Sequence, residues 1–350
     1  MKTGISISIE MPKASKHILV IRLSAMGDVA MTVPVLWALT TQHPELKITV
    51  LTKGFFKPFF RDIENVDVFS ADVKGEHKGV FGLYKLAKQL NSEHQIYAIA
   101  DLHSVLRSKV LKKFIRCRRF ISIDKGRKEK KALIDGKTFK QLKTTHQRYA
   151  DVFMALGYEV DISNPNFPKK GNLDVKTRAY FGKNFKKCIG IAPFAAHQGK
   201  MYPLDLMKEV IAQLQKDYSI ILFGGGEKEI QLLNDIQADF SNVSSVAGKL
   251  TLNEEMDVIS NLDVMLSMDS GNAHVAAMLG IKVVSVWGVT HPYAGFAPFN
   301  QPEDYALLAD REQFPLIPTS VYGNKCPKGY EDASASILPE AVVGKIKSIL

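Results

Sequence analysis

Cysteine, tryptophan and long apolar runs are scarce in this sequence of 350 residues, which contains three cysteines and two tryptophans. No apolar run approaches the roughly 20 residues that a membrane-spanning helix needs. Residues 1–16 contain no continuous apolar segment typical of a secretory signal, so we interpret them as an N-terminal extension. Three widely separated cysteines fit neither a disulfide framework nor a zinc site, which indicates a reducing, cytoplasmic environment.

Familiar motifs of nucleotide and metal chemistry are also missing. The sequence has neither a G-x-x-x-x-G-K-[ST] P-loop nor a G-x-G-x-x-G dinucleotide fingerprint. It also lacks an Asp-x-Asp pair, which argues against the usual carboxylate-pair metal site for a nucleotide sugar, so we expect no metal. The composition, 46% hydrophobic and 23% charged, is ordinary for a globular protein and excludes a wholly disordered chain, a collagen-like fibre and a coiled coil.

The net charge of +10 is distributed unevenly along the chain. Residues 1–170 carry 30 basic and 16 acidic side chains, whereas residues 171–350 carry 16 and 20. Residues 107–148 alone contain 16 basic and 3 acidic side chains. Such a block attracts nucleic acid, anionic lipid or a phosphorylated substrate, although a merely solvated basic face has the same composition.

Short apolar runs alternate with amphipathic stretches in both halves, a pattern typical of parallel, doubly wound α/β sheets. The segment 163–171, with its prolines and lysines, predicts a linker. We therefore expect two Rossmann-like domains, 17–165 and 172–338, that face an interdomain cleft, and a closing helix at 339–350. The polar, lysine-rich stretch 126–139 is expected to be a mobile loop.

Polar residues follow the predicted strands, at the sheet edge where ligands bind in open α/β folds. After the first strand, Gly27 permits a tight turn or the close approach of a substrate. Asp28 starts the next helix, expected over residues 29–42 with Pro34 inside it. The helix dipole favours an ionised carboxylate there, which makes Asp28 a candidate general base. An N-cap aspartate after an ordinary turn is the alternative.

A second group of residues follows the predicted strand at 262–268. Small residues at the start of the next helix leave backbone N–H groups free for an anion, and Ser270 adds a hydroxyl. His274 returns to the same helix face three residues after Gly271. A capped helix with a histidine facing the core is the alternative.

Two further residues are placed to meet a ligand at strand ends. Glu227 follows three consecutive glycines and is a candidate hydrogen-bond acceptor for a ribose, unless the glycines form only a flexible turn. Lys200, in the loop 199–203, is expected to point into the same cleft and neutralise a phosphate, although a lone loop lysine is usually just solvated.

Together these motifs resemble glycosyltransferase family 9, the heptosyltransferases that build the lipopolysaccharide core. The N-terminal hallmark of that family matches Met26-Gly27-Asp28-Val29. The C-terminal hallmark matches residues 269–277 and then Gly288-Val289-Thr290-His291-Pro292. The stretches 101–108, 146–149 and 200–203 are also similar, and the resemblance extends over about residues 17–300.

The resemblance implies a GT-B architecture and an inverting, metal-independent transfer from a nucleotide sugar, with ADP-heptose as the default donor and no cofactor. It implies that Asp28 is the catalytic base. The residues that would bind the nucleotide sugar are Lys200, Glu227 (with Glu229 as an alternative alignment), Asp269, Ser270, Gly271 and His274.

An anionic glycolipid, the lipopolysaccharide core or a related envelope glycan, is the implied acceptor. The N-terminal domain would bind it, with Gly27, Asp101 and Arg107 as candidate contacts. The basic block also suggests peripheral contact with the cytoplasmic face of the inner membrane.

Three other functions remain open. A sugar-nucleotide epimerase or hydrolase of the same fold needs no acceptor, and therefore no large basic face. A nucleic-acid-binding protein would use residues 107–148, but that block has few aromatic residues and no recognisable nucleic-acid module, so we expect no nucleic-acid partner. A non-catalytic family member is the third, against which the presence of Asp28 and Lys200 argues weakly.

Overall fold

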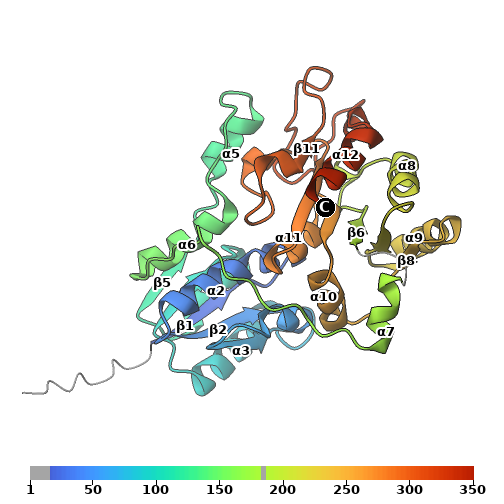
Figure 1. Cartoon of the computed structure of the whole chain (residues 1–350). Helices are drawn as coiled ribbons and strands as arrows, with labels where there is room; N and C mark the ends of the chain where they lie inside the picture. The colour runs from blue at the N-terminus through green and yellow to red at the C-terminus, as the bar shows by residue number, and fades with distance from the viewer. Residues whose placement is uncertain (1–15, 183–186) are drawn as a thin grey trace, which may run out of the picture.

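Each half of the chain builds its own parallel sheet (Figure 1). The computed structural model describes residues 16–182 and 187–350, so nearly all of the predicted N-terminal extension lies outside the described residues. The first sheet has five strands in the order β3-β2-β1-β4-β5, and the second has six in the order β11-β10-β9-β6-β7-β8. The predicted α/β class with two doubly wound sheets is therefore confirmed.

The first half contains the strands β1 (His17–Ile21), β2 (Lys47–Thr52), β3 (Val66–Ser70), β4 (Ala98–Asp101) and β5 (Arg119–Ser122). Its helices are α1 (Met26–Ala30), α2 (Thr32–Gln42), the 3-10 helix η1 (Gly54–Phe60), α3 (Gly79–Glu93), α4 (Leu106–Phe114), α5 (Arg127–Ile134) and α6 (Thr145–Leu156).

The second half contains the strands β6 (Cys188–Ala192), β7 (Ser219–Leu222), β8 (Val243–Ser245), β9 (Val264–Met268), β10 (Lys282–Trp287) and β11 (Ala306–Leu308). Its α-helices are α7 (Val175–Arg178), α8 (Leu204–Leu214), α9 (Glu227–Asp239), α10 (Leu252–Ser260), α11 (Gly271–Met278) and α12 (Pro339–Ile349). Short 3-10 turns lie at Ala179–Phe181, Gln198–Lys200, Pro292–Ala294, Glu303–Tyr305 and Ala333–Ser336.

Each sheet has a switch point, at which the carboxyl ends of two adjacent strands form an expected ligand site. The order of connection reverses between β1 and β4 in the first sheet, and between β6 and β9 in the second. Ligands of doubly wound sheets bind beyond the carboxyl ends of the strands at such switch points. We propose the domain division 17–165, 172–338 and 339–350 for this fold, since each sheet lies within one of the first two ranges.

The central strands are apolar on both faces because helices cover both sides of each sheet. Every residue of β6 and of β9 is buried, as expected for parallel strands between two helical layers. The largest buried cluster includes residues of both halves, among them Val29 of α1 and Ala273 of α11. The halves therefore share apolar packing. Among the described residues, no helix has the length and apolar character needed to cross a bilayer.

The expected single helix over residues 29–42 was wrong. The chain forms α1 and α2, with a break at Met31. Pro34 has no N–H to donate to the carbonyl of Ala30, so a continuous helix would lose a hydrogen bond at this point. The Thr32 hydroxyl instead donates to the carbonyl of Val29 at 2.6 Å.

The expected mobile loop at 126–139 was also wrong, because residues Arg127–Ile134 form α5. Gly126 precedes this helix with a φ of 61°, in the left-handed region that glycine favours. Leu133 is buried against Ala294 of the second half. The Lys130 ammonium lies 4.1 Å from the centre of the Phe296 ring. Thus α5 projects from the first half toward the second (Figure 1).

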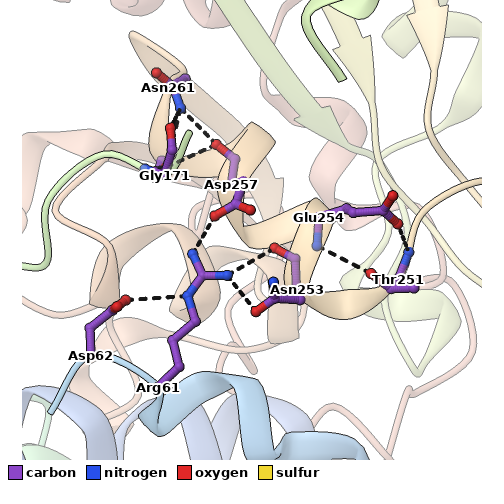
Figure 2. A network of polar contacts seen from close by, with 9 residues as sticks. Arg61, Asp62, Gly171, Thr251, Asn253, Glu254, Asp257 and Asn261 are labelled. Carbon is purple, nitrogen blue, oxygen red and sulfur yellow. Dashed lines mark hydrogen bonds and ion pairs between the residues drawn. The ribbon is translucent and has the colours of Figure 1, made fainter. Parts of the chain in front are cut away.

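Polar contacts also join the two halves, and one group of them centres on Arg61 (Figure 2). The Arg61 guanidinium, just after η1, donates to the Asn253 carbonyl at 3.2 Å and forms an ion pair with Asp257 of α10. On the same helix, Asn261 donates to the carbonyl of Gly171 at 2.8 Å, in the segment that connects the halves. Helix α10 therefore holds both the first half and the connecting segment.

A second polar attachment lies near the start of α6. The N–H of Leu142 donates to the Tyr293 carbonyl at 3.0 Å, and the N–H of Thr145 donates to the Gly295 carbonyl at 2.8 Å. The Thr145 hydroxyl donates to the same carbonyl of Gly295 at 2.9 Å. These bonds join the first half to the turn that follows β10.

We expect Arg61→Ala to lower the free energy of unfolding by about 1–3 kcal/mol, the range for hydrogen bonds to charged groups, because Asp257 would lose its partner. Urea denaturation measures this change. Lys176→Ala is the matched control, since it removes an exposed pair with Glu254 on the same helix and should change stability little. Equal losses in the two variants would contradict a special role for Arg61.

Candidate active site

Helix α1 of the first half packs directly against α11 of the second half, and two glycines permit this contact. A Cβ atom on Gly27 would lie 2.8 Å from Cδ2 of His274 and 3.3 Å from Cα of Gly271. A Cβ atom on Gly271 would lie 2.5 Å from Cε of Met26. The residues that follow β1 and those that follow β9 are therefore brought together, although they are far apart in sequence.

Asp28 is fixed in place and still reachable. Its carboxylate forms an ion pair with Arg22 at 2.6 Å and accepts a hydrogen bond from the N–H of Ala25 at 3.2 Å. The side chain remains 28% exposed and lines a pocket of about 200 Å³. A carboxylate that is held in one orientation and open to a pocket has the geometry required of a general base.

The pocket at Asp28 is rich in positive charge. Arg22, Lys125, Lys130 and Arg148 line it, and the side chains of Lys130 and Arg148 are themselves buried. Burial and the neighbouring charge of Arg148 lower the pKa of Lys130 to about 8. Burial, then the charge of Arg22, also lowers the pKa of Lys125. Cations that are desolvated and close together are stabilised by a bound anion, so the pocket is suited to an acidic ligand.

The second half contributes to the walls of the same pocket. Phe296 and Tyr322 line it, opposite residues such as Tyr149 of α6. Burial raises the pKa of Tyr149, whose hydroxyl donates to the carbonyl of Asp28 at 3.3 Å. Burial also lowers the pKa of His103, another lining residue, to about 4, so its ring is neutral near pH 7.

Lys200 and Asp269 lie together in the second half. The Lys200 ammonium is 2.9 Å from the Asp269 carboxylate, and the two side chains are 13% and 9% exposed. The Thr290 hydroxyl donates to the same carboxylate oxygen at 2.8 Å. Asp269 and Thr290 thus fix the position of Lys200 after β6, close to the start of α11.

The start of α11 offers both backbone donors and an unpartnered imidazole nitrogen. Ser270 is the N-cap residue, and its Oγ lies 3.1 Å from Oγ of Ser267. The first N–H groups of a helix have no partner within the helix. His274 is buried, which lowers its pKa, and its Nδ1 has no hydrogen-bond partner among the described residues.

Three predicted contact residues do not join this arrangement. Asp101 is fully buried and accepts hydrogen bonds from the Ser108 and Ser122 hydroxyls at 2.8 and 3.1 Å, so its carboxylate holds the turn after β4. Arg107 is exposed at the start of α4, outside the pocket lining. Glu227 is exposed at the start of α9.

Glu229, the alternative to Glu227, has a partner within its own turn. Its carboxylate accepts a hydrogen bond from the N–H of Gly225 at 2.8 Å. The glycine-rich turn after β7 is therefore held by Glu229, whereas Glu227 is exposed to solvent.

Sequence reasoning missed the residues that make the pocket positive. Lys130 belongs to the segment 126–139 that was expected to be a loop, Lys125 directly precedes that segment, and Arg148 lies in α6. The excess of basic residues over 107–148 was the available signal, but it could not show which of them face inward. Within the described ranges, no group of three or more His, Cys, Asp or Glu side chains is placed to hold a metal ion.

Comparison with known proteins gives consistent matches. A family model described as glycosyltransferase family 9 (heptosyltransferase) matches residues 83–315. The chain is 25% identical to the lipopolysaccharide core heptosyltransferase OpsX of Haemophilus influenzae over 297 residues, which cover 82% of this chain and 83% of that protein.

Solved structures share the fold. A glycosyltransferase family 9 protein from Veillonella parvula has a TM-score of 0.75 at 19% identity, with 97% of this chain and 98% of that chain covered. The heptosyltransferase WaaC from E. coli, solved with ADP, has a TM-score of 0.70 at 17% identity, with 95% and 100% covered. At this level of identity the likeness establishes the GT-B fold.

We expect Gly27→Ala to destabilise the protein by about 1–3 kcal/mol, the usual range for overpacking, because the added methyl group would overlap His274. Urea denaturation measures this loss. Gly344→Ala is the matched control: its helix has open space at that position, so alanine should stabilise it by up to about 1 kcal/mol. If Gly27→Ala left the free energy of unfolding unchanged, α1 and α11 would not be in fixed contact.

Proposed function

The chain belongs to glycosyltransferase family 9 and is a glycosyltransferase, and from this premise we propose that it transfers heptose from ADP-heptose to a lipopolysaccharide-core acceptor, without a metal and with inversion. The observation that carries the proposal is the contact between α1 and α11. It brings a carboxylate of one half beside a helix N-terminus of the other. The names of the relatives, heptosyltransferases of the lipopolysaccharide core, support the choice of sugar and acceptor.

We propose that the second half holds the donor and stabilises its leaving group. As the bond between sugar and phosphate breaks, positive charge develops on the anomeric carbon and negative charge on the diphosphate. Lys200 and the N–H groups that follow Ser270 would stabilise that negative charge. Asp269 would position Lys200, and His274 would offer its free Nδ1 to the donor.

Two more donor contacts complete this part of the proposal. Gly271 has no side chain to obstruct the diphosphate at the start of α11. Glu227, exposed at the start of α9, would bind the ribose hydroxyls.

In the proposed reaction Asp28 is the base. The acceptor hydroxyl oxygen bonds to the anomeric carbon, its proton passes to the Asp28 carboxylate, and the nucleoside diphosphate leaves with the bonding electron pair from the opposite face. Because the acceptor attacks the anomeric carbon on the face opposite the departing diphosphate, the configuration inverts. Arg22 and the N–H of Ala25 would orient the carboxylate.

The acceptor would enter the positive pocket beside Asp28. Lys125, Lys130 and Arg148 would bind an acidic group of the acceptor. The sequence had suggested Gly27, Asp101 and Arg107 as acceptor contacts. We place the reaction in the cytoplasm, at the face of the inner membrane where a glycolipid acceptor would be presented. An epimerase or hydrolase would not need this second, cationic pocket, so the pocket favours a transferase.

Asp28→Asn is expected to reduce transfer by at least about 100-fold, because an amide cannot take up the acceptor proton. Donor binding should survive, so ADP-heptose should raise the melting temperature of the variant and of the wild type alike. Lys200→Ala, by contrast, should reduce both the rise in melting temperature that ADP-heptose produces and the rate of transfer.

These measurements also decide the proposal. Loss of donor stabilisation in Asp28→Asn would contradict its role as the base. If a different nucleotide sugar, and not ADP-heptose, raised the melting temperature of the wild type, that nucleotide sugar would be the donor. If no nucleotide or nucleotide sugar tested raised the melting temperature of the wild type, the proposed function would be overturned.

The acceptor KM should rise as the pH increases above about 8, because Lys130 loses its positive charge as pH passes its pKa and the attraction for an acidic group falls with it. Lys130→Ala should raise the KM near pH 7 by roughly 10-fold and flatten its increase above pH 8. Lys128→Ala, an exposed neighbour on the same helix, should retain the wild-type profile. Steady-state kinetics between about pH 6.5 and about 9.5 measure the acceptor KM. A wild-type KM that does not change with pH would contradict the role of Lys130.

A further inference from the structure

The start of α3 exposes a group of large apolar side chains. Phe81 is 91% exposed, and Val80 and Tyr84, on the same side of the helix, are 58% and 54% exposed. Helix α3 lies on the side of the first sheet opposite α2, and it buries its other side, including Leu83 and Leu86, against the strands (Figure 1). Isolated apolar side chains are common on protein surfaces, but a group of them marks a surface that a partner or a membrane covers.

Helix α4 lies beside α3 and also begins with an exposed apolar residue. Leu106, the first residue of α4, is 77% exposed. The ring centres of Tyr84 and Phe114 are 5.4 Å apart, and the Asn91 amide donates to the Phe114 carbonyl at 2.9 Å. Both helices follow strands of the same parallel sheet, so both begin at its carboxyl edge. The exposed apolar residues of α3 and α4 therefore lie at one edge of the sheet.

Basic side chains follow the apolar ones along both helices. Lys109 and Lys113 lie on the same side of α4 as Leu106, and Lys88 lies one turn after Tyr84 on α3. All three lysines are exposed, and none forms an ion pair with a described residue. At 1.5 Å per residue, they follow the apolar side chains by about 5–10 Å along the helices. We refer to these residues together as the α3–α4 face: Val80, Phe81, Tyr84, Lys88, Leu106, Lys109 and Lys113.

The order of side chains on the α3–α4 face matches the boundary of a lipid bilayer. Helices bound at that boundary bury apolar side chains about 5–10 Å deep, while their lysines reach the headgroups. Anionic lipids attract each lysine that lies near the membrane surface. A second copy of the same face is a poorer partner, because α4 contains four basic and no acidic residues, and two such helices would repel one another. Charge therefore favours an anionic bilayer.

We propose that the α3–α4 face docks the protein on a membrane surface that contains anionic lipid. Phe81 and Leu106 insert among the lipids, and the three lysines of the face contact the headgroups. Asp28 follows β1 at the same carboxyl edge of the sheet, so docking turns the edge that carries the proposed base toward the bilayer. The use of this orientation rests on the proposed function, because it takes the acceptor to be anchored in the bilayer.

Co-sedimentation with vesicles tests the docking without donor or acceptor. The wild type should bind vesicles of phosphatidylethanolamine and phosphatidylglycerol, bind vesicles of phosphatidylcholine much less, and dissociate as the salt concentration rises. Two paired variants, Phe81→Asp with Leu106→Asp and Lys109→Glu with Lys113→Glu, should each lower the partition coefficient for the anionic vesicles at least about 10-fold.

Matched controls change the net charge equally on the second half. Val175→Asp with Leu338→Asp replaces two residues that are 90% and 62% exposed, and Lys216→Glu with Lys228→Glu reverses two exposed lysines. Both control pairs should retain most of the vesicle binding. An equal loss in test and control pairs, or no loss in either test pair, would overturn the docking. A wild type that ignores vesicles but forms a dimer that Phe81→Asp with Leu106→Asp dissociates would also overturn it, and would make the face an interface between copies.

Transfer assays separate this inference from the proposed function. Both test pairs should transfer heptose to a water-soluble core oligosaccharide as the wild type does, which also shows that they fold. For an acceptor embedded in anionic vesicles, their KM should rise by roughly 10-fold or more, in line with the lost partitioning. If vesicle binding depends on the α3–α4 face but the wild type transfers no heptose, the proposed reaction is wrong while the docking stands.

Discussion

The close contact between Gly27 and Gly271 is the constraint on which the rest of the site depends. A methyl group at Gly27 would overlap the buried His274 ring, and one at Gly271 would displace the end of the Met26 side chain. The close approach of the two helices places Asp28 near the start of α11, which leaves room for the proposed sugar only between these two elements. Chemistry that needs groups from two sheets is possible here because the smallest residue occupies both sides of the contact.

Positive charge concentrated in a buried place is the second organising feature. Lys130 and Arg148 are both buried, and burial together with the charge of Arg148 disfavours the charged form of Lys130. The compensation within the protein is partial: Arg148 pairs with Glu129, and Lys130 lies over the Phe296 ring. Under the proposed function an acidic group of the acceptor would supply the rest, so the same charges that are unfavourable when buried together would favour binding of the acceptor.

Much of the fold could be predicted from the sequence, because local signals were clear. Gly157 ends α6 in the left-handed region, as glycine often does after a helix, and Thr251 with Glu254 forms a capping box at the start of α10. The approach of Asp28 to the turn after β9 followed from the rule that ligands bind at the ends of parallel strands. The positive pocket could not be predicted, because its lining comes from separate segments that only the fold brings together.

The wrong prediction of a loop at 126–139 has its origin in composition. The sequence of α5 is mostly charged, and its apolar face consists of few residues, so its packing against the second half was hidden. Asp101 shows the opposite problem. In the sequence, an aspartate after a strand gives the same signal whether it binds a ligand or accepts hydrogen bonds from nearby hydroxyls. In this structure, Asp101 accepts hydrogen bonds from Ser108 and Ser122. Burial decides between the two cases, and burial is a property of the fold.

The separate attachments between the halves have a mechanical consequence. Two rigid bodies that touch at one place can pivot freely, and two places of contact leave a hinge about the line between them. Here α1 meets α11, Arg61 meets α10, and Thr145 meets Gly295. Each further attachment removes a degree of freedom, so a rotation of one half against the other must first release polar bonds. The polar bonds of Arg61 with α10 and of Thr145 with Gly295 therefore restrain such a rotation. Among the described residues, the apolar contact of α1 with α11 contains no polar bond that a rotation would have to break.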